Sequence, residues 1–249
     1  MIFSTSRDFL FLKGKKVAGT SVEMALSTVC GPDDIITPIT PIDERERLRN
    51  DGRGAQNYSR FPGKERAYLA RLLSASQTEL AEIFAPPAQF HHHMSLEKFV
   101  KCYGSMPTER MFCVERCPYA KIISSANMAN NFSSYKQEGG AMINNLDKIR
   151  TVIAEQRPKK ALLLCKNIDR YRDREGNLRA RVLRHEQLAE DFASLMNEYG
   201  ISPVPALPHA KQGINSNSVD PRTVFTRQQL NDINEIFAEE FEVFGYERV

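Results

Sequence analysis

The sequence predicts an α/β fold in which a mainly parallel sheet is flanked by helices. Residues 9–29 and 111–125 carry this prediction, because each segment begins with a short apolar run, passes through a turn and continues at helical spacing. Strand and helix signals also alternate along most of the remaining chain, as they do in α/β proteins. No flexible linker and no internal repeat divide the 249 residues, so we expect a single domain over 1–249.

The first of these segments is the one around which we expect a site to form. The apolar run 9–12 leads into Lys13-Gly14-Lys15-Lys16-Val17-Ala18-Gly19-Thr20-Ser21, and a helical pattern follows. Such a turn aims backbone N–H groups and the positive end of a helix dipole at one point, which suits a phosphate. The alternative is an ordinary strand-to-helix turn with solvated lysines.

This loop is close to the phosphate-binding pattern of nucleotide triphosphatases, G-x-x-x-x-G-K-[ST], but differs from it at one position. Gly14 and Gly19 have the required separation, whereas Thr20 stands where the lysine should be and the cation lies inside the loop at Lys16. The β/γ-phosphate clamp is therefore missing. We accordingly expect a P-loop-like three-layer sandwich with an altered phosphate loop.

The next part of the chain mixes irregular and helical patterns. Residues 31–60 carry Thr-Pro steps, glycines and many charges, and predict an irregular excursion that either borders a substrate cleft or is a plain surface loop. Residues 64–85 return to helical spacing, and Ser76 with Glu79 resembles a capping box that would start a second helix.

Three consecutive histidines then precede a helix whose N-cap is predicted at Ser95. In an extended segment, His91 and His93 would point the same way and His92 the opposite way. His91 and His93 could then line a pocket, where a neutral imidazole can take a proton from a hydroxyl. The alternatives are a solvated histidine patch and a metal site. No other histidine stands at ligand spacing, so we predict no metal.

The second strand-turn-helix segment places an arginine at a strand end. The apolar run 111–114 is followed by Arg116 and by Pro118, which fits the first turn of a helix. Arg116 and Ser124, two turns into that helix, could grip one anion from two sides. Arginine at a helix start is also common as a solvated residue, and this alternative stays open.

The remaining elements follow from periodicity and turn residues. They are a helix at 142–155, a buried strand at 161–165, a hairpin tip at 171–178, a helix at 187–199 closed by Gly200, a loop at 202–219 containing Lys211, and a last apolar-sided helix capped by Thr226.

Composition excludes several classes of function. A net charge of +3 is too small for a nucleic-acid-binding stripe, so we expect no nucleic-acid partner. The 5 cysteines form no short-domain disulfide framework, which indicates reduced thiols and a cytoplasmic location. No segment has the length and apolar character of a membrane span or a signal peptide. The sequence does not predict an oligomeric state.

In this order, the segments resemble the sulfotransferases that use 3′-phosphoadenosine 5′-phosphosulfate (PAPS). The loop that reads roughly P-K-T-x-G-T-S in that family is Lys15 to Ser21 here, and R-D-P-x-x-R-x-x-S is similar to Arg116 to Ser124. The carbohydrate-type branch, which includes enzymes like heparan sulfate 2-O-sulfotransferase and bacterial relatives, adds an H-x-H segment that matches His91 to His93. Its R-Y-E-x-L-x-x-D-F pattern resembles residues 184–192, and the ending Phe-x-x-Phe-Gly-Tyr resembles residues 241–246.

The resemblance implies PAPS as the donor and 3′-phosphoadenosine 5′-phosphate (PAP) as its product. The histidine segment favours a hydroxyl acceptor on an oligosaccharide or glycolipid, and a small metabolite or a phenolic alcohol stays open as the alternative. The resemblance also implies His93 as the catalytic base, His91 as its assistant and Lys16 as the cation on the transferred group. The residues it assigns to the donor are Lys16, Gly19, Thr20, Ser21, Arg116 and Ser124. We add Lys15, Ala18 and Lys211 as further candidates for donor binding.

Four positions depart from the family pattern, namely Lys13-Gly14-Lys15 in place of His-x-Pro, Cys117 in place of aspartate, Lys121 in place of arginine and His185 in place of tyrosine. Two other functions compete with sulfuryl transfer. A small-molecule or nucleotide kinase with a divergent phosphate loop would require Mg²⁺ and ATP, and the missing lysine after Gly19 argues against it. A non-catalytic nucleotide-binding module would bind the donor or PAP without turnover.

Overall fold

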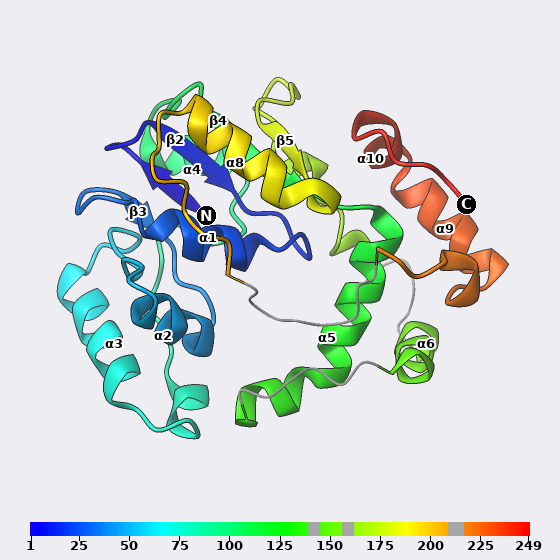
Figure 1. The fold of residues 1–249 in the computed structure, drawn as a ribbon, viewed down its shortest axis with the longest axis horizontal. Helices are drawn as coiled ribbons and strands as arrows, with labels where there is room; N and C mark the ends of the chain where they lie inside the picture. Colours follow the sequence, from blue (N-terminus) through cyan, green and yellow to red (C-terminus); the bar gives the residue numbers. More distant parts are fainter. Residues whose placement is uncertain (139–144, 156–161, 209–216) are drawn as a thin grey trace.

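A five-stranded sheet forms the centre of the computed structural model, which describes residues 1–138, 145–155, 162–208 and 217–249 (Figure 1). Its strands lie in the order β3-β1-β2-β4-β5. They are β1 (Ile2–Ser4), β2 (Phe9–Leu12), β3 (Ile35–Ile36), β4 (Met111–Glu115) and β5 (Arg181–Arg184). β2, β4 and β5 run parallel, whereas β1 is antiparallel to both β2 and β3. The α/β class is confirmed, and the parallel part of the sheet is limited to these three strands.

Helices surround the sheet. They are α1 (Gly19–Ser27), α2 (Pro41–Arg49), α3 (Pro62–Ser74), α4 (Leu96–Tyr103), α5 (Pro118–Glu138), α6 (Leu146–Glu155), α8 (Leu188–Glu198), α9 (Arg227–Ile236) and α10 (Ala238–Val243). Short 3₁₀ turns are η1 (Glu79–Glu82), η2 (Ile168–Arg170), η3 (His185–Gln187) and η4 (Pro221–Thr223). None of the helices in the described ranges is both long and apolar enough to cross a bilayer.

The sheet is covered on both faces because alternate residues of its strands point to opposite sides. Leu10 and Leu12 of β2 face a core that includes Leu96 and Phe99 of α4. Phe9 and Phe11 face a second core, to which α1 and α8 contribute the apolar residues Val22, Ala25, Leu26, Phe192, Leu195 and Met196. Two helical layers therefore enclose the sheet, as expected of an α/β sandwich.

Two smaller groups of helices flank this sandwich. α2 and α3 lie on the β3 side, where Tyr68 and Leu72 of α3 pack with Leu80 of η1 (Figure 1). α5, α6, α9 and α10 lie on the opposite side and share a core of their own that contains Tyr119, Ile149, Ile233 and Phe237. The C-terminal part of the chain thus packs along α5, next to the end of β4.

Several boundaries agree with the sequence. β2, α1 and β4 form where they are predicted, and the Ser95 side chain accepts from Lys98 N as an N-cap. Gly200, directly after the C-cap of α8, has φ +71°, a left-handed conformation that glycine adopts at little cost. Thr226 caps α9 through a capping box with Gln229.

The segment predicted as an irregular excursion contains the helix α2, so that prediction is wrong for residues 41–49. Thr40 caps the helix, Pro41 occupies its first turn, and Glu44 accepts from the backbone N–H of Ala55 at 2.8 Å. Glu44 also pairs with Arg47 at 3.1 Å, and neither side chain is exposed. α2 buries charged groups instead of an apolar stripe, and hydrophobic periodicity therefore misses it.

Three other predictions need correction. Residues 162–165 form a short helical turn, and the buried strand predicted there is wrong, since Leu163 and Leu164 are each 57% exposed. The capping box of Ser76 and Glu79 is present, but it opens the 3₁₀ turn η1. The single last helix is two, α9 and α10, which meet at Phe237.

Candidate functional site

The predicted phosphate loop and Arg116 lie at the same edge of the sheet. β2 and β4 are parallel neighbours with Leu12 in register with Cys113, so the segments that follow them leave the sheet side by side. Ligands of α/β proteins bind at this carboxyl edge of parallel strands. The start of α1 and the start of α5 consequently border one region.

The loop between β2 and α1 has an unusual backbone. Lys16 (φ +64°) and Ala18 (φ +60°) are both left-handed, although neither is glycine. Non-glycine residues in this region are uncommon and cluster at ligand-binding loops, where the surrounding structure holds them in place. Ala18 is the N-cap of α1 and supplies no side-chain hydrogen bond, so the first N–H groups of the helix are left to other partners.

Asn167, at the start of η2, holds this loop in place although it lies 152 residues after Lys15 in the chain. Its Oδ1 accepts from Lys15 N at 2.8 Å and its Nδ2 donates to Lys15 O at 3.1 Å, so both backbone groups of Lys15 are paired with one side chain. Asn167 is fixed in turn, because its own N–H donates to Glu240 Oε1 at 2.5 Å.

Glu240 belongs to a fully buried charged cluster under the loop. Lys121 Nζ pairs with Glu240 and, at 2.8 Å, with Glu115 Oε2, while Tyr171 Oη donates to Glu115 Oε1 at 2.7 Å. Burial raises the pKa of Glu115, with Glu240 adding to the effect and Lys121 opposing it. Lys121, at the second basic position of the predicted 3′-phosphate motif, is therefore occupied in holding the core together.

Gly14 is the point at which the loop touches this cluster. A Cβ on Gly14 would lie 2.2 Å from Tyr171 Oη and 2.9 Å from Asn167 Nδ2.

We expect Gly14→Ala to displace both groups and to lower the free energy of unfolding by about 1–3 kcal/mol, the usual cost of overpacking. Urea denaturation measures this loss. Gly63→Ala in α3 is the matched control, since its Cβ would meet nothing within 4 Å and alanine favours a helix. Equal stability of the two variants would contradict the close approach.

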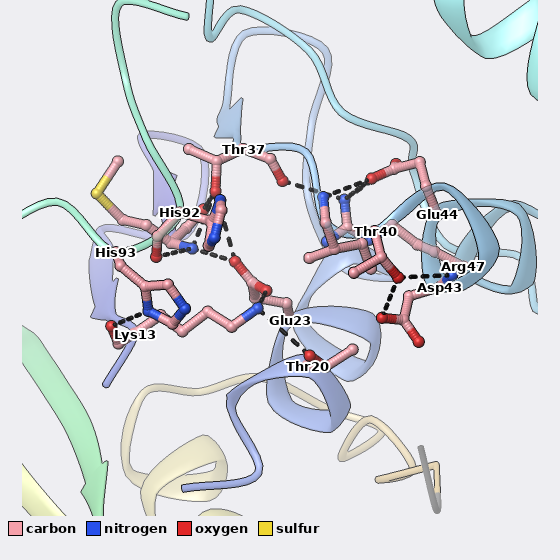
Figure 2. A network of polar contacts seen from close by, with 12 residues as sticks. Lys13, Thr20, Glu23, Thr37, Thr40, Asp43, Glu44, Arg47, His92 and His93 are labelled. Atoms are coloured by element: carbon pink, nitrogen blue, oxygen red, sulfur yellow. Dashed lines mark hydrogen bonds and ion pairs between the residues drawn. The ribbon is translucent and has the colours of Figure 1, made fainter. Parts of the chain in front are cut away.

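Lys13, at the end of β2, sends its side chain across the start of α1 (Figure 2). Its Nζ pairs with Glu23 of α1 and donates to Thr20 Oγ1 at 3.4 Å. Glu23 is 0% exposed and also accepts from the amino group of Met1. Burial would raise the pKa of Glu23, but Lys13, the Met1 amine and Arg47 together hold it well below its ordinary value. The Glu23 carboxylate is thus a fixed negative charge beside the loop.

The histidine segment forms a turn directly next to Lys13. Met94 N donates to His91 O at 3.0 Å, which closes the turn, and the rings of His92 and His93 meet edge to face at 4.4 Å. The predicted extended conformation, with His92 pointing away from His93, is therefore wrong. The His91 side chain is exposed, whereas that of His93 is partly buried. Arg170 Nη1 donates to His93 O and anchors the turn.

The hydrogen bond of His93 defines its tautomer. Nδ1 lies 3.1 Å from Lys13 O, and because a carbonyl oxygen only accepts, Nδ1 carries the proton and Nε2 presents a lone pair. Burial, with smaller effects from Lys13 and His92, lowers the pKa of His93 to about 2. The ring is accordingly neutral near pH 7. This is the form that a general base requires.

Arg116 is held in a second polar cluster at the start of α5. Its Nε donates to Asn217 Oδ1 at 2.7 Å, and Asn217 Nδ2 lies 3.1 Å from His185 Nδ1. Burial lowers the pKa of Arg116 to about 10, which leaves the guanidinium charged at pH 7, and burial beside Arg116 lowers the pKa of His185 to about 4. The late segments that resemble family motifs meet here, because Tyr246 Oη donates to Glu186 Oε2 at 3.0 Å and Glu186 Oε1 accepts from Cys117 N at 3.3 Å.

Cys165 links the loop to α5. Its thiol hydrogen-bonds with the Ser125 side chain and lies within the electrostatic influence of Lys121, Lys16 and Lys15, while burial raises its pKa. Burial also lowers the pKa of Lys15, and nearby Arg170 lowers it further. Lys15, Lys16 and Arg170 thus concentrate positive charge on the side of the loop that faces α5.

The structure brings most of the predicted site residues to this edge. Gly19, Thr20 and Ser21 form the first turn of α1, Lys15, Lys16 and Ala18 lie in the loop before it, and His93 is bonded to the start of the loop. Ser124 is partly exposed on α5, whereas Lys211 falls outside the described residues. In the part of the chain that is described, no group of three or more His, Cys, Asp or Glu side chains could hold a metal ion.

Sequence reasoning missed five residues that shape the site, namely Lys13, Glu23, Asn167, Arg170 and Asn217. Glu23 gives a signal in the sequence, since it is a charged residue within an otherwise apolar or small helix. Lys13 stands at the start of the predicted loop, but the sequence does not show that its side chain pairs with Glu23. Asn167, Arg170 and Asn217 join segments more than 70 residues apart, and no local pattern marks them.

Comparison with protein-family models, with curated proteins and with solved structures finds no match for this chain. An α/β sandwich hosts many unrelated activities, so its function has to be argued from the chemistry of the site.

Proposed function

We propose that this protein is a sulfotransferase that moves a sulfuryl group from PAPS to a hydroxyl acceptor. The observation that carries the proposal is the position of His93, a neutral imidazole tied to the first residue of a lysine-rich loop before an open helix start. Arg116 supplies a second anion-binding group at the same sheet edge. The resemblance of these segments to the carbohydrate-type sulfotransferases supports the same conclusion.

The donor fits the two clusters by charge and by hydrogen-bonding capacity. The loop, treated as a P-loop-like phosphate site, offers Lys15, Lys16 and the N–H groups at the start of α1 to a 5′-phosphosulfate. Arg116, whose Nε is already held by Asn217, can turn the rest of its guanidinium toward a 3′-phosphate, with Ser124 on α5, the helix that follows it. Bound PAPS would supply an activated sulfonate on a good leaving group.

His93 is assigned the proton transfer. Its Nδ1 stays bonded to Lys13 O, so Nε2 takes the proton of the acceptor hydroxyl as that oxygen bonds to sulfur. Lys16 and the loop amides neutralise charge that develops toward the leaving 5′-phosphate, as cations do in phosphoryl transfer. His91 remains a predicted assistant. We propose an oligosaccharide or glycolipid hydroxyl as the acceptor, in the cytoplasm, with no nucleic acid involved.

Titration calorimetry tests the proposal against a kinase with a divergent loop. We expect PAP to bind, and ATP with Mg²⁺ to bind far more weakly, because Thr20 replaces the lysine that would reach the β- and γ-phosphates. Arg116→Ala should raise the Kd of PAP by about ten- to a hundredfold, which is the contribution of a charge-assisted hydrogen bond. Arg49→Ala, an exposed arginine at the end of α2, is the control. Tight binding of ATP with Mg²⁺ and none of PAP would favour the kinase, and PAP binding without turnover of PAPS would favour a binding module.

A further inference from the structure

The side chain of Lys13 takes an unusual course for a residue at a strand end. It passes over the start of α1 so closely that a Cβ on Gly19 would lie 2.7 Å from Lys13 Cγ and 3.1 Å from its Cε. Only glycine leaves room for this path. The glycine of the loop therefore serves to admit a lysine to the first turn of α1, where the helix N–H groups are uncapped.

The ammonium group is placed next to a hydroxyl of the same turn. Lys13 Nζ donates to Thr20 Oγ1 at 3.4 Å. Because that hydroxyl accepts from Lys13, its own hydrogen points elsewhere and can be donated to an anion. Thr20 occupies the position that holds lysine in nucleotide triphosphatases. A cation thus reaches this position from the end of β2 instead of from the helix itself.

Lys13 also carries the contact that orients the predicted base. His93 Nδ1 is bonded to Lys13 O, and the Lys13 ammonium is bonded to Thr20 Oγ1 (Figure 2). One residue therefore positions both the predicted base and the ammonium group. A base acts on the attacking oxygen, and a cation is needed on the group that is attacked. The two must be a short and fixed distance apart.

Glu23 fixes the position of the ammonium. The carboxylate is fully buried on α1 and pairs with Lys13 from the side away from the loop. The charged and titratable groups that face this carboxylate are Lys13, the Met1 amine, Arg47 and His92. Among these, Lys13 has the largest effect on the carboxylate. The pair therefore holds the lysine side chain in a fixed orientation.

We propose that Lys13 is a second catalytic cation, which donates to an oxygen of the sulfonate being transferred, and that Glu23 is its positioning residue. The assignment rests on the proposed sulfuryl transfer. Lys13 keeps its own protons throughout. The electron pair of the broken sulfur–oxygen bond goes to the 5′-phosphate, the new bond forms to the acceptor oxygen, and the acceptor proton goes to His93 Nε2.

The test compares donor and product, because PAPS carries the sulfonate and PAP does not. Lys13→Gln alone would leave the buried Glu23 carboxylate without its strongest ion-pair partner, with the Met1 amine as the remaining one, and would lower the stability of the fold. The double variant Lys13→Gln/Glu23→Gln removes both charges, and thermal melting checks that it is folded. By calorimetry without acceptor, we expect PAP to bind as to the wild type and PAPS to bind about ten- to a hundredfold more weakly. Turnover should fall by about a hundred- to a thousandfold.

The outcomes of this test distinguish the assignment from the proposed function. A folded double variant that binds PAPS and turns it over like the wild type contradicts the role of Lys13 and leaves the proposed function standing. An equal loss of affinity for PAP and for PAPS has the same meaning. A wild type that binds neither compound overturns the proposed function and the assignment together. If the double variant does not fold, Lys13→Met/Glu23→Met replaces the same buried pair with apolar side chains, and an unchanged preference for PAPS over PAP in that variant overturns the assignment. Lys101→Gln, exposed on α4, is the control for lost lysine charge.

Discussion

His93→Ala is expected to lower turnover by about a hundred- to ten-thousandfold, the usual contribution of a general base. The variant loses the lone pair at Nε2 but leaves the lysine-rich loop and Arg116 intact, so PAP should bind to it as tightly as to the wild type. Turnover of PAPS with a responsive acceptor and calorimetry with PAP measure the two effects. Added imidazole should restore part of the activity, since it can enter the space that the ring leaves.

Turnover equal to that of the wild type would remove His93 as the base. A parallel loss of PAP affinity would instead mean that the ring supports the loop through Lys13 O. The two results therefore distinguish a catalytic role from a structural one.

The pH dependence of the wild type gives a separate check on His93. Because its pKa is lowered to about 2 by burial and by Lys13, the ring stays neutral from pH 8 down to about pH 5. An unperturbed histidine, with a pKa near 6.5, would already lose base function over this range. We expect kcat/KM to show no acid limb from His93. The negative charge of bound donor raises the pKa, so kcat should decline at a higher pH than kcat/KM does.

Lys121→Met is expected to lower the free energy of unfolding by about 3–5 kcal/mol, the cost of breaking a buried ion pair. Lys121 is the cation between Glu115 and Glu240, and none of the three side chains is exposed. Without Lys121 the two carboxyl groups repel each other, and we expect the hydrogen bond from Asn167 N to Glu240 to weaken. Urea denaturation measures the loss, and PAP calorimetry follows its effect on the loop.

The matched control replaces all three groups with neutral ones, as Glu115→Gln/Lys121→Met/Glu240→Gln. We expect this variant to recover most of the stability, because no buried charge remains unpaired. The penalty of Lys121→Met alone should shrink as the pH falls from 8 to 5. Loss of the cation raises the pKa of Glu115 further, so the folded state binds more protons than the unfolded state and gains stability at lower pH. A penalty that is independent of pH would contradict this account.

The parts of the fold that the sequence predicts are those with strong local patterns. β2 and α1 show an apolar run, a glycine-containing turn and a helical period within 20 residues, and β4 with the start of α5 repeats this order. The same patterns place Lys16 and Arg116 at one edge, because parallel strands with helical crossovers end together.

The missed elements are those that depend on partners distant in sequence. β1 and β3 have three and two residues, too short for a period, and they form by pairing with β2 and with each other. The apolar run Leu162-Leu163-Leu164 predicts a buried strand, yet these residues themselves form a helical turn, closed by the bond from Cys165 N to Leu162 O at 2.9 Å. Apolar content alone cannot tell a strand from a surface-exposed helical turn.

The same limit applies to the site. Each residue of the loop is visible in the sequence, but the residues that hold it, Asn167 and Glu240, act through hydrogen bonds to the backbone. Such contacts place few demands on neighbouring residue types. The role of Lys13 likewise depends on its path over Gly19, which only coordinates reveal.

The link from Glu240 through Asn167 to Lys15 determines when during synthesis the loop can take its final form. A nascent chain that has left the ribosome only as far as α8 already contains β2, α1, β4 and Asn167. It still lacks the carboxylate that fixes Asn167 and shares the charge of Lys121. Such a chain should have a folded sheet and a loop at Lys15 that lacks its final support, so translation of α10 would be the step that completes the loop.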